Sequence, residues 1–82
     1  MASRILLFTQ PGCLSCEVMK MFLEAKGIAF EERDMSGDAA CVELLETYHG
    51  RTAPTLVILT TSGATVIEGF DPERLDQLLS AA

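Results

Sequence analysis

Two continuous apolar runs are the clearest signals in the hydrophobic pattern of this chain. Ile5 to Phe8 and Leu56 to Leu59 each place four large apolar residues in succession. Runs of this length are typical of strands that are buried on both faces of a sheet. We therefore predict strands over residues 4–9 and 55–60, with both near the centre of the sheet.

Two weaker patterns predict the remaining strands. Residues 28–34 alternate only loosely between apolar and charged side chains, which favours a short strand closer to the sheet edge. Residues 64–68 follow the turn sequence Thr61-Ser62-Gly63, which is typical of a hairpin. We expect this last strand to run antiparallel to the strand at 55–60.

Helical spacing of apolar residues begins after Pro11-Gly12 breaks the first strand. We predict a helix over residues 13–26, and Gly27 fits its end. Met19 and Met21 are both interpreted as packing residues. The inward face of the helix is expected to consist of the apolar residues at helical spacing: Leu14, Val18, Met21, Phe22 and Ala25.

Two further helices follow the same rules. The turn at residues 36–38 precedes the second helix, which is expected to end at His49-Gly50. Its predicted inward residues are Cys41, Leu44, Leu45 and Tyr48. The third helix is predicted to have Asp71 as its N-cap and Pro72 as its first residue. Its predicted inward residues are Leu75, Leu78 and Leu79.

The order of elements is therefore β-α-β-α-β-β-α, over a single domain of residues 1–82. A β-α-β unit requires a parallel pair of strands, whereas the added hairpin is antiparallel. We therefore predict an α/β fold in which three helices flank a mixed four-stranded sheet.

Composition and charge narrow the classes of function. Six basic residues, scattered along the chain, stand against twelve acidic ones and give a net charge of -6, which disfavours nucleic acid as a partner. No stretch has the length of a membrane span or of a signal-peptide core. Three cysteines, an odd number, fit a reducing compartment. We expect a cytoplasmic monomer that binds neither nucleic acid nor membrane.

The candidate chemistry lies in Cys13-Leu14-Ser15-Cys16, where the first strand gives way to the first helix. Disulfide exchange needs two sulfurs that can come within bonding distance in a tight loop, and a C-x-x-C at a helix start supplies that geometry. The positive end of the helix favours the thiolate of Cys13, which we assign as the nucleophile. Cys16 lies one turn inside, should be more buried, and is assigned as the resolving thiol.

Three motifs in order resemble the glutaredoxin family of the thioredoxin fold over essentially the full length of the chain. They are Phe8-Thr9-x-x-x-Cys13-x-x-Cys16, Thr52-Ala53-Pro54 and Gly69-Phe70-Asp71. The resemblance implies a cis peptide bond between Ala53 and Pro54. It also implies a substrate or glutathione site that comprises Gln10, Arg51, Thr52, Ala53, Pro54, Gly69, Phe70 and Asp71.

Departures from the family pattern concern the electron donor. Glutathione-using members usually have a lysine where this chain has Gln10, and an aromatic residue inside the C-x-x-C where it has Leu14-Ser15. The Gly-Phe-x-Pro segment at residues 69–72 is closer to the NrdH-type redoxins, which take electrons from thioredoxin reductase. Those proteins commonly have Trp-Ser before this segment, where this chain has Ile67-Glu68.

The expected function is a small dithiol oxidoreductase of cell redox homeostasis that reduces protein or low-molecular-weight disulfides. The electron source is either glutathione or thioredoxin reductase, and no cofactor is expected to be tightly bound. The alternative is a glutathione-dependent iron–sulfur or metal carrier of the glutaredoxin type. A zinc site is disfavoured because the spacing of Cys41 and His49 from the C-x-x-C does not match that of zinc ligands. A copper-chaperone domain is disfavoured because its strands and helices follow a different order.

Overall fold

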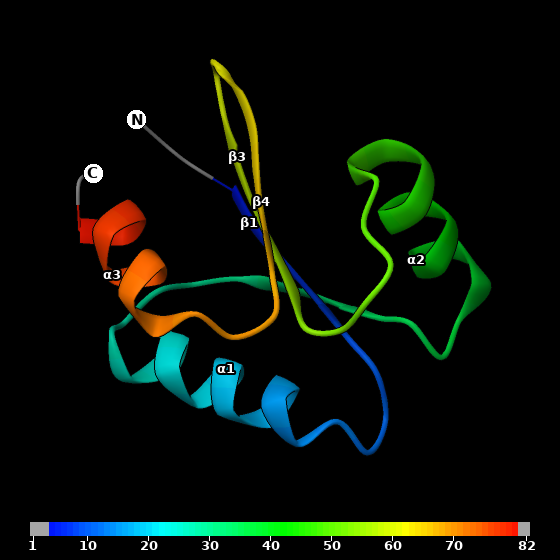
Figure 1. Ribbon diagram of the computed structural model, residues 1–82, viewed down its shortest axis with the longest axis horizontal. Coiled ribbons are helices and arrows are strands. Elements are labelled where there is room, and N and C mark those ends of the chain that lie inside the picture. Colours follow the sequence, from blue (N-terminus) through cyan, green and yellow to red (C-terminus); the bar gives the residue numbers. More distant parts are fainter. Residues whose placement is uncertain (1–3, 81–82) are drawn as a thin grey trace.

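The computed structural model describes residues 4–80 and contains the expected order of elements (Figure 1). The strands and helices are β1 (Arg4–Thr9), α1 (Leu14–Ala25), β2 (Glu31–Asp34), α2 (Asp38–Val42), η1 (Glu43–Thr47), β3 (Thr55–Thr60), β4 (Gly63–Glu68) and α3 (Pro72–Ser80). The two predicted central strands have the bounds expected from their apolar runs. Residues 28–30 lie outside β2, and the last five residues of the second helix form a π-helical turn, η1.

The four strands form one mixed sheet in the order β2-β1-β3-β4. β1 pairs in parallel with β2 and antiparallel with β3, and β3 pairs antiparallel with β4. The predicted thioredoxin-like α/β fold is therefore confirmed. β1 and β3 occupy the centre of the sheet, where their continuous apolar runs are covered on both faces.

Alternate residues of the central strands supply two separate cores. On one face Ile5 and Leu7 pack with α1 and α3, through residues that include Leu23 and Leu75. On the other face Leu6 and Phe8 pack against the second helix. Figure 1 shows this arrangement, with α1 and α3 together on one side of the sheet and α2 on the other.

The orientation of α1 differs from the sequence prediction. Its fully buried residues are Cys16, Met19 and Leu23, whereas Leu14 is 79% exposed and Met21 is 68% exposed. Of the five residues predicted to face inward, only Phe22 packs against the core as a partly buried side chain. The helix is therefore rotated by about half a turn relative to the prediction.

The end of α1 follows the expected glycine stop. Gly27 has a φ of +70°, and its N–H donates to the carbonyl of Glu24 at 3.0 Å. The N–H of Ile28 donates to the carbonyl of Leu23, also at 3.0 Å, which completes a Schellman motif. Ile28 then packs against the core, so the chain is fixed as it turns toward β2.

The second helix buries fewer residues than predicted. Leu44 is buried and Tyr48 is partly buried, but Leu45 and Cys41 are exposed. Cys41 is therefore not a core residue, and its Sγ donates to the carbonyl of Met35 at 3.1 Å. The shift to π-helical pairing within η1 changes which side chains face the sheet, and sequence periodicity of 3.6 does not capture this change.

The third helix begins as expected. Asp71 accepts the N–H of Arg74 at 3.2 Å, as an N-cap does, and Pro72 is the first helical residue. Leu75 is fully buried, whereas Leu78 is 36% exposed, so its predicted burial is wrong. The side chain of Leu79 lies outside the described residues.

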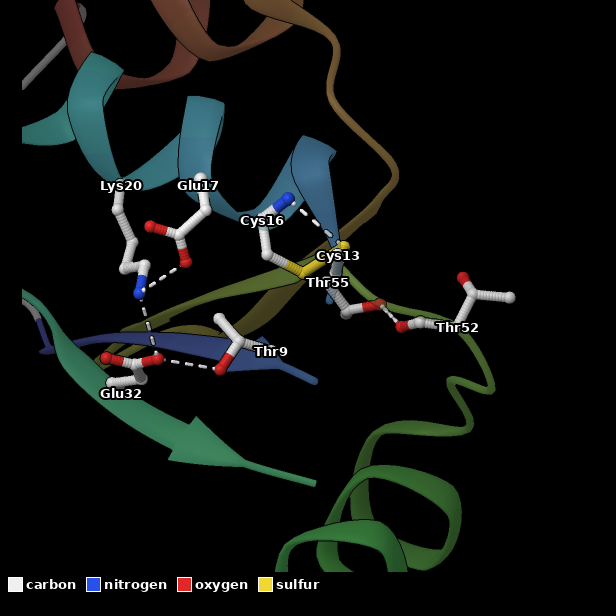
Figure 2. Close-up of a disulfide and its surroundings, with 8 residues drawn as sticks. All are labelled: Thr9, Cys13, Cys16, Glu17, Lys20, Glu32, Thr52 and Thr55. Atoms are coloured by element: carbon white, nitrogen blue, oxygen red, sulfur yellow. Dashed lines mark hydrogen bonds and ion pairs between the residues drawn. A yellow bond between two sulfur atoms is a disulfide. The ribbon is translucent and has the colours of Figure 1, made fainter. Parts of the chain in front are cut away.

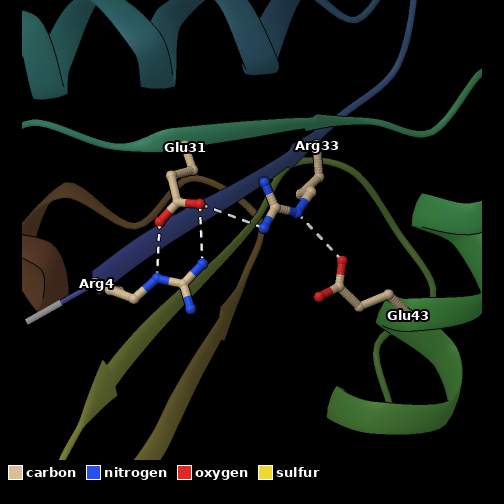
Figure 3. Close-up of polar contacts among 4 residues, drawn as sticks. All are labelled: Arg4, Glu31, Arg33 and Glu43. Carbon is tan, nitrogen blue, oxygen red and sulfur yellow. Dashed lines mark hydrogen bonds and ion pairs between the residues drawn. The ribbon is translucent and has the colours of Figure 1, made fainter.

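Ion pairs fix the edge strand β2 (Figure 3). Arg4 donates from both Nε and Nη2 to the carboxylate of Glu31, at 2.9 Å each, and this pairing lowers the pKa of Glu31. Arg33 bridges Glu31 at 3.4 Å and Glu43 of η1 at 3.2 Å. The edge strand is thus tied to β1 by charge as well as by its backbone pairing.

Candidate redox site

The first turn of α1 holds the two cysteines of the C-x-x-C. β1 ends at Thr9, a tight turn with Gly12 at a φ of +73° follows, and Cys13 is the N-cap of α1. The N–H of Cys16 donates to Sγ of Cys13 at 3.1 Å. The side chain of a cysteine therefore does here what a serine or aspartate does at an ordinary N-cap.

Cys13 and Cys16 form a disulfide, and their Cα atoms lie 5.2 Å apart (Figure 2). The two sulfurs differ in access to solvent, because Cys13 is half-buried whereas Cys16 is only 1% exposed. An incoming thiol or disulfide can therefore reach the first sulfur and not the second. This asymmetry matches the separate roles of a nucleophilic and a resolving thiol.

The sheet brings three loops to the same end of the molecule. Phe8, near the end of β1, pairs with Thr55 at the start of β3, and Thr55 also pairs with Glu68 at the end of β4. Three segments therefore lie at the same end of the sheet: the turn that carries Cys13, residues 52–54 and residues 69–71. Three motifs that are far apart in sequence meet there.

The Ala53–Pro54 peptide bond is cis, as the resemblance implied. The carbonyl of Pro54 accepts the N–H of Gly69 at 2.8 Å, so two of the three loops are bonded directly. Thr55 donates from its hydroxyl to the carbonyl of Thr52 at 2.6 Å, which fixes the turn before the cis bond.

Gln10 and Arg51 line one open hollow of about 470 Å³ beside the second helix. Both side chains are exposed, and Cys41 belongs to the same lining. The structure thus brings together two of the residues predicted to contact glutathione or substrate. An anionic ligand here would meet one cationic side chain, Arg51, and one neutral one.

Phe70 and Asp71 have other contacts. The ring of Phe70 packs edge-to-face on Phe22, with centroids 5.7 Å apart, and Asp71 caps α3. Their side chains serve packing and capping. Within the segment at residues 69–71, the backbone at Gly69 is the part bonded to the Pro54 loop.

The sequence did not predict the row of polar contacts that lies beside the disulfide (Figure 2). The hydroxyl of Thr9 donates to Glu32 at 2.7 Å, and Lys20 lies 3.4 Å from Glu32 and 2.9 Å from Glu17. Hydrogen bonding to Glu17 is the first cause of the raised pKa of Lys20. The i,i+3 spacing of Glu17 and Lys20 is visible in the sequence, but the contact to Glu32 depends on how α1 lies over the sheet.

The described part of the chain, residues 4–80, contains no group of three or more metal-ligating side chains. Cys41 lines the hollow next to Gln10, and His49 lies exposed at the end of the second helix with a φ of +60°. Within the same residues, every helix is too short or too polar to cross a bilayer.

The site combines a thioredoxin-like sheet, a disulfide at the first turn of α1, and a cis-proline loop at the same end of the sheet. This combination defines the class of thiol–disulfide redox proteins. Within that class, residues 5–61 match the glutaredoxin family, and the chain belongs to this family.

Individual relatives are similar to this chain over most of its length. The SPbeta prophage-derived thioredoxin-like protein YosR of Bacillus subtilis is 30% identical, over 93% of this chain and 94% of its own. The crystal structure of the thioredoxin-like protein BC3987 is 39% identical, with a TM-score of 0.78 over 92% of this chain and 99% of that one. The glutaredoxin grx-1 of Archaeoglobus fulgidus, 18% identical, shares the fold with a TM-score of 0.75, over 94% of this chain and 86% of that one.

Proposed function

We propose that this chain is a small thiol–disulfide oxidoreductase that reduces protein or low-molecular-weight disulfides. The observation that carries the proposal is the pairing of an accessible Cys13 at a helix N-terminus with a buried Cys16 in one disulfide. The cycle uses these two sulfurs alone and needs no tightly bound cofactor. We expect it to operate in a monomer in the cytoplasm, where a free Cys41 would stay reduced.

The proposed reaction runs in two exchange steps. In the reduced protein the Cys13 thiolate attacks the substrate disulfide, a mixed disulfide forms, and the first substrate sulfur leaves and takes up a proton. The thiolate of Cys16 then attacks Sγ of Cys13, which releases the second substrate thiol and closes the Cys13–Cys16 disulfide. Two electrons pass to the substrate, and a dithiol donor or two monothiols must return them.

The local geometry supports Cys13 as the attacking group. Its Sγ accepts the N–H of Cys16 at 3.1 Å and lies at the positive end of α1. Both interactions stabilise negative charge on this sulfur more than they stabilise the neutral thiol. Burial of Cys16 keeps the resolving sulfur away from a second substrate until the mixed disulfide has formed.

Substitution of each cysteine tests the cycle. Cys13→Ser should abolish reduction of insulin and of hydroxyethyl disulfide, because the C-x-x-C then lacks its accessible nucleophile. Cys16→Ser should instead accumulate a mixed disulfide through Cys13, detectable by mass spectrometry. Normal turnover by the Cys13→Ser variant would refute the proposed function.

For the electron donor we favour thioredoxin reductase over glutathione. The hollow lined by Gln10 and Arg51 offers one cation to a tripeptide with two carboxylates, where glutathione-using relatives usually add a lysine. Two coupled assays, one with thioredoxin reductase and one with glutathione and glutathione reductase, should give fast turnover only in the first. Gln10→Lys should raise the glutathione-coupled rate selectively, and faster wild-type turnover with glutathione would contradict this choice.

A further inference from the structure

The outward face of α1 is apolar along its whole length. Leu14, Val18, Met21 and Ala25 are exposed and recur at intervals of four, three and four residues, which places them on one line along the helix. We call these four residues the α1 stripe. It lies opposite the buried residues of the helix, Cys16, Met19 and Leu23, and in Figure 1 no other element within the described residues covers the side of α1 that faces away from the sheet.

The α1 stripe begins at the reactive sulfur. Gly12, Cys13, Leu14 and Glu17 line an open hollow of about 390 Å³, so the first residue of the stripe is also a wall of the space in front of Cys13. From there the stripe runs the length of α1, on the order of 17 Å at 1.5 Å per residue. A molecule that reaches Cys13 along this side therefore covers the stripe as it approaches.

Negative charge borders the stripe. Glu17 and Glu24 follow one edge of the helix, and both are exposed. The side chain of Glu17 pairs with Lys20 but remains 65% exposed. The chain as a whole carries a net charge of -6, so its electrostatic field favours a basic binding partner.

We propose that the α1 stripe is the docking surface for the protein that exchanges a disulfide with Cys13, and that this partner has an apolar segment flanked by Lys or Arg next to its reactive cysteine. The proposal rests on the proposed redox function. Contact with the stripe places the partner sulfur in the hollow at Cys13, so docking and exchange are coupled.

The size of the stripe favours such a partner over a second copy of this chain. Four side chains along one helix cover a few hundred Å², whereas a stable dimer buries roughly 800 Å² on each subunit. Transient redox encounters fall at the small end of interface sizes. Two copies would also bring together two chains that each carry a net charge of -6.

The test uses three disulfide probes that carry the same leaving group. Each is a cysteine linked through a disulfide to nitrothiobenzoate. Attack by the reduced protein releases the nitrothiobenzoate anion, which is coloured. The first cysteine lies in an amphipathic peptide with leucines on one face and lysines beside them, the second in the same peptide with glutamates in place of lysines, and the third is N-acetylcysteine. Stopped-flow measurement gives a second-order rate constant for each.

Two matched variants isolate the stripe. Val18→Ser removes an apolar side chain that is 40% exposed on the stripe, and Val42→Ser removes one that is 51% exposed on α2. Met21→Gln, combined with Val18→Ser, removes a second stripe residue. None of these residues belongs to the disulfide or to the hollow of Gln10 and Arg51.

We expect the wild-type protein to react about tenfold faster with the lysine peptide than with the glutamate peptide at low salt, and this preference should shrink as salt is added. The Val18→Ser/Met21→Gln variant should lose about tenfold with the lysine peptide, since it loses two apolar contacts. Val42→Ser should keep the wild-type rate, and all variants should react equally with N-acetylcysteine.

Equal wild-type rates with the two peptides, or equal losses in Val18→Ser and Val42→Ser, would overturn the docking surface. A parallel loss with N-acetylcysteine would overturn it as well, because the substitutions would then act on Cys13 itself. A wild-type dimer in sedimentation that Val18→Ser dissociates would assign the stripe to a second copy instead. Failure of the wild-type protein to react with any probe would refute the redox function, a result distinct from the loss of peptide preference alone.

Discussion

Two methionines on α1 provide a direct test of how the helix lies on the sheet. Met19 is fully buried in the core beneath the helix, whereas Met21, two residues later, is 68% exposed. The same substitution, Met→Ala, therefore removes the same three heavy atoms from two opposite environments. Because alanine is a slightly better helix former than methionine, helix propensity favours both variants equally.

The expected magnitudes differ widely. Met19→Ala removes apolar atoms that the structure buries completely and leaves a cavity among Leu7, Leu23 and their neighbours, which costs about 2–4 kcal/mol of unfolding free energy. In a domain of this size, that loss corresponds to a decrease in melting temperature of about 10–25 °C. Met21→Ala removes atoms that already contact water, and its effect should stay within about 0.5 kcal/mol.

Urea unfolding followed by circular dichroism measures both variants against the wild-type protein. All three proteins should be kept oxidised, so that the disulfide constrains each unfolded chain equally. The slope of free energy against urea should stay the same, since the surface exposed on unfolding hardly changes. Equal losses in the two variants, or a larger loss at Met21, would refute the helix orientation and with it the exposure of the α1 stripe.

Three further predictions concern other parts of the chain. Gly50→Ala should cost about 1–3 kcal/mol in urea unfolding, because the added Cβ would lie 2.8 Å from Cδ1 of Leu44; an unchanged midpoint would contradict that contact. Glu31→Gln should destabilise the protein at neutral pH, and the difference from wild type should shrink as the pH falls below 4.5, the ordinary pKa of a glutamate, and vanish once Glu31 is protonated. Arg4 lowers the pKa of Glu31 in the folded state. The stabilisation by this ion pair is therefore complete above the pKa of Glu31 in the unfolded chain, and it is lost as the carboxylate protonates. A difference that persists in acid would argue against the ion pair. Iodoacetamide should label the oxidised protein at Cys41, the exposed free thiol, and an unlabelled protein would place this residue in the core after all.

The strands were the most predictable part of the fold. Each central run has four apolar residues in succession, so apolar side chains point to both faces of the strand. Burial on both sides follows directly. Residues 28–30 are different, because Ile28 and Phe30 pack against the core without entering the sheet. Apolar character predicts their burial but not their backbone pairing.

The face of α1 could not be chosen from periodicity alone. Two apolar sets share helical spacing, one with Met19 and Leu23 and the other with Leu14, Val18 and Met21. A helical pattern identifies each set equally well and does not say which of them faces the sheet.

The cis bond before Pro54 followed from a family motif and not from local chemistry, since an X–Pro bond in isolation favours trans. The meeting of Gln10 and Arg51 in one hollow needs the three-dimensional path of the second helix, with its π-helical turn. The contact of Phe70 with Phe22 likewise depends on how the segment between β4 and α3 lies against α1, and sequence spacing carries no information on that placement.

In the proposed cycle, the requirement for a buried resolving thiol links the chemistry to the shape of the surface. Cys16 can resolve a mixed disulfide selectively only if it is hidden, and its burial fixes the rotation of α1, because residues three and seven positions later then also face the core. Those residues are Met19 and Leu23. The same rotation turns the other apolar set outward, and Leu14 of that set lines the hollow in front of Cys13. The helix orientation that protects one sulfur therefore also presents an apolar surface that leads to the other, which is the arrangement that the proposed protein partner of Cys13 would use.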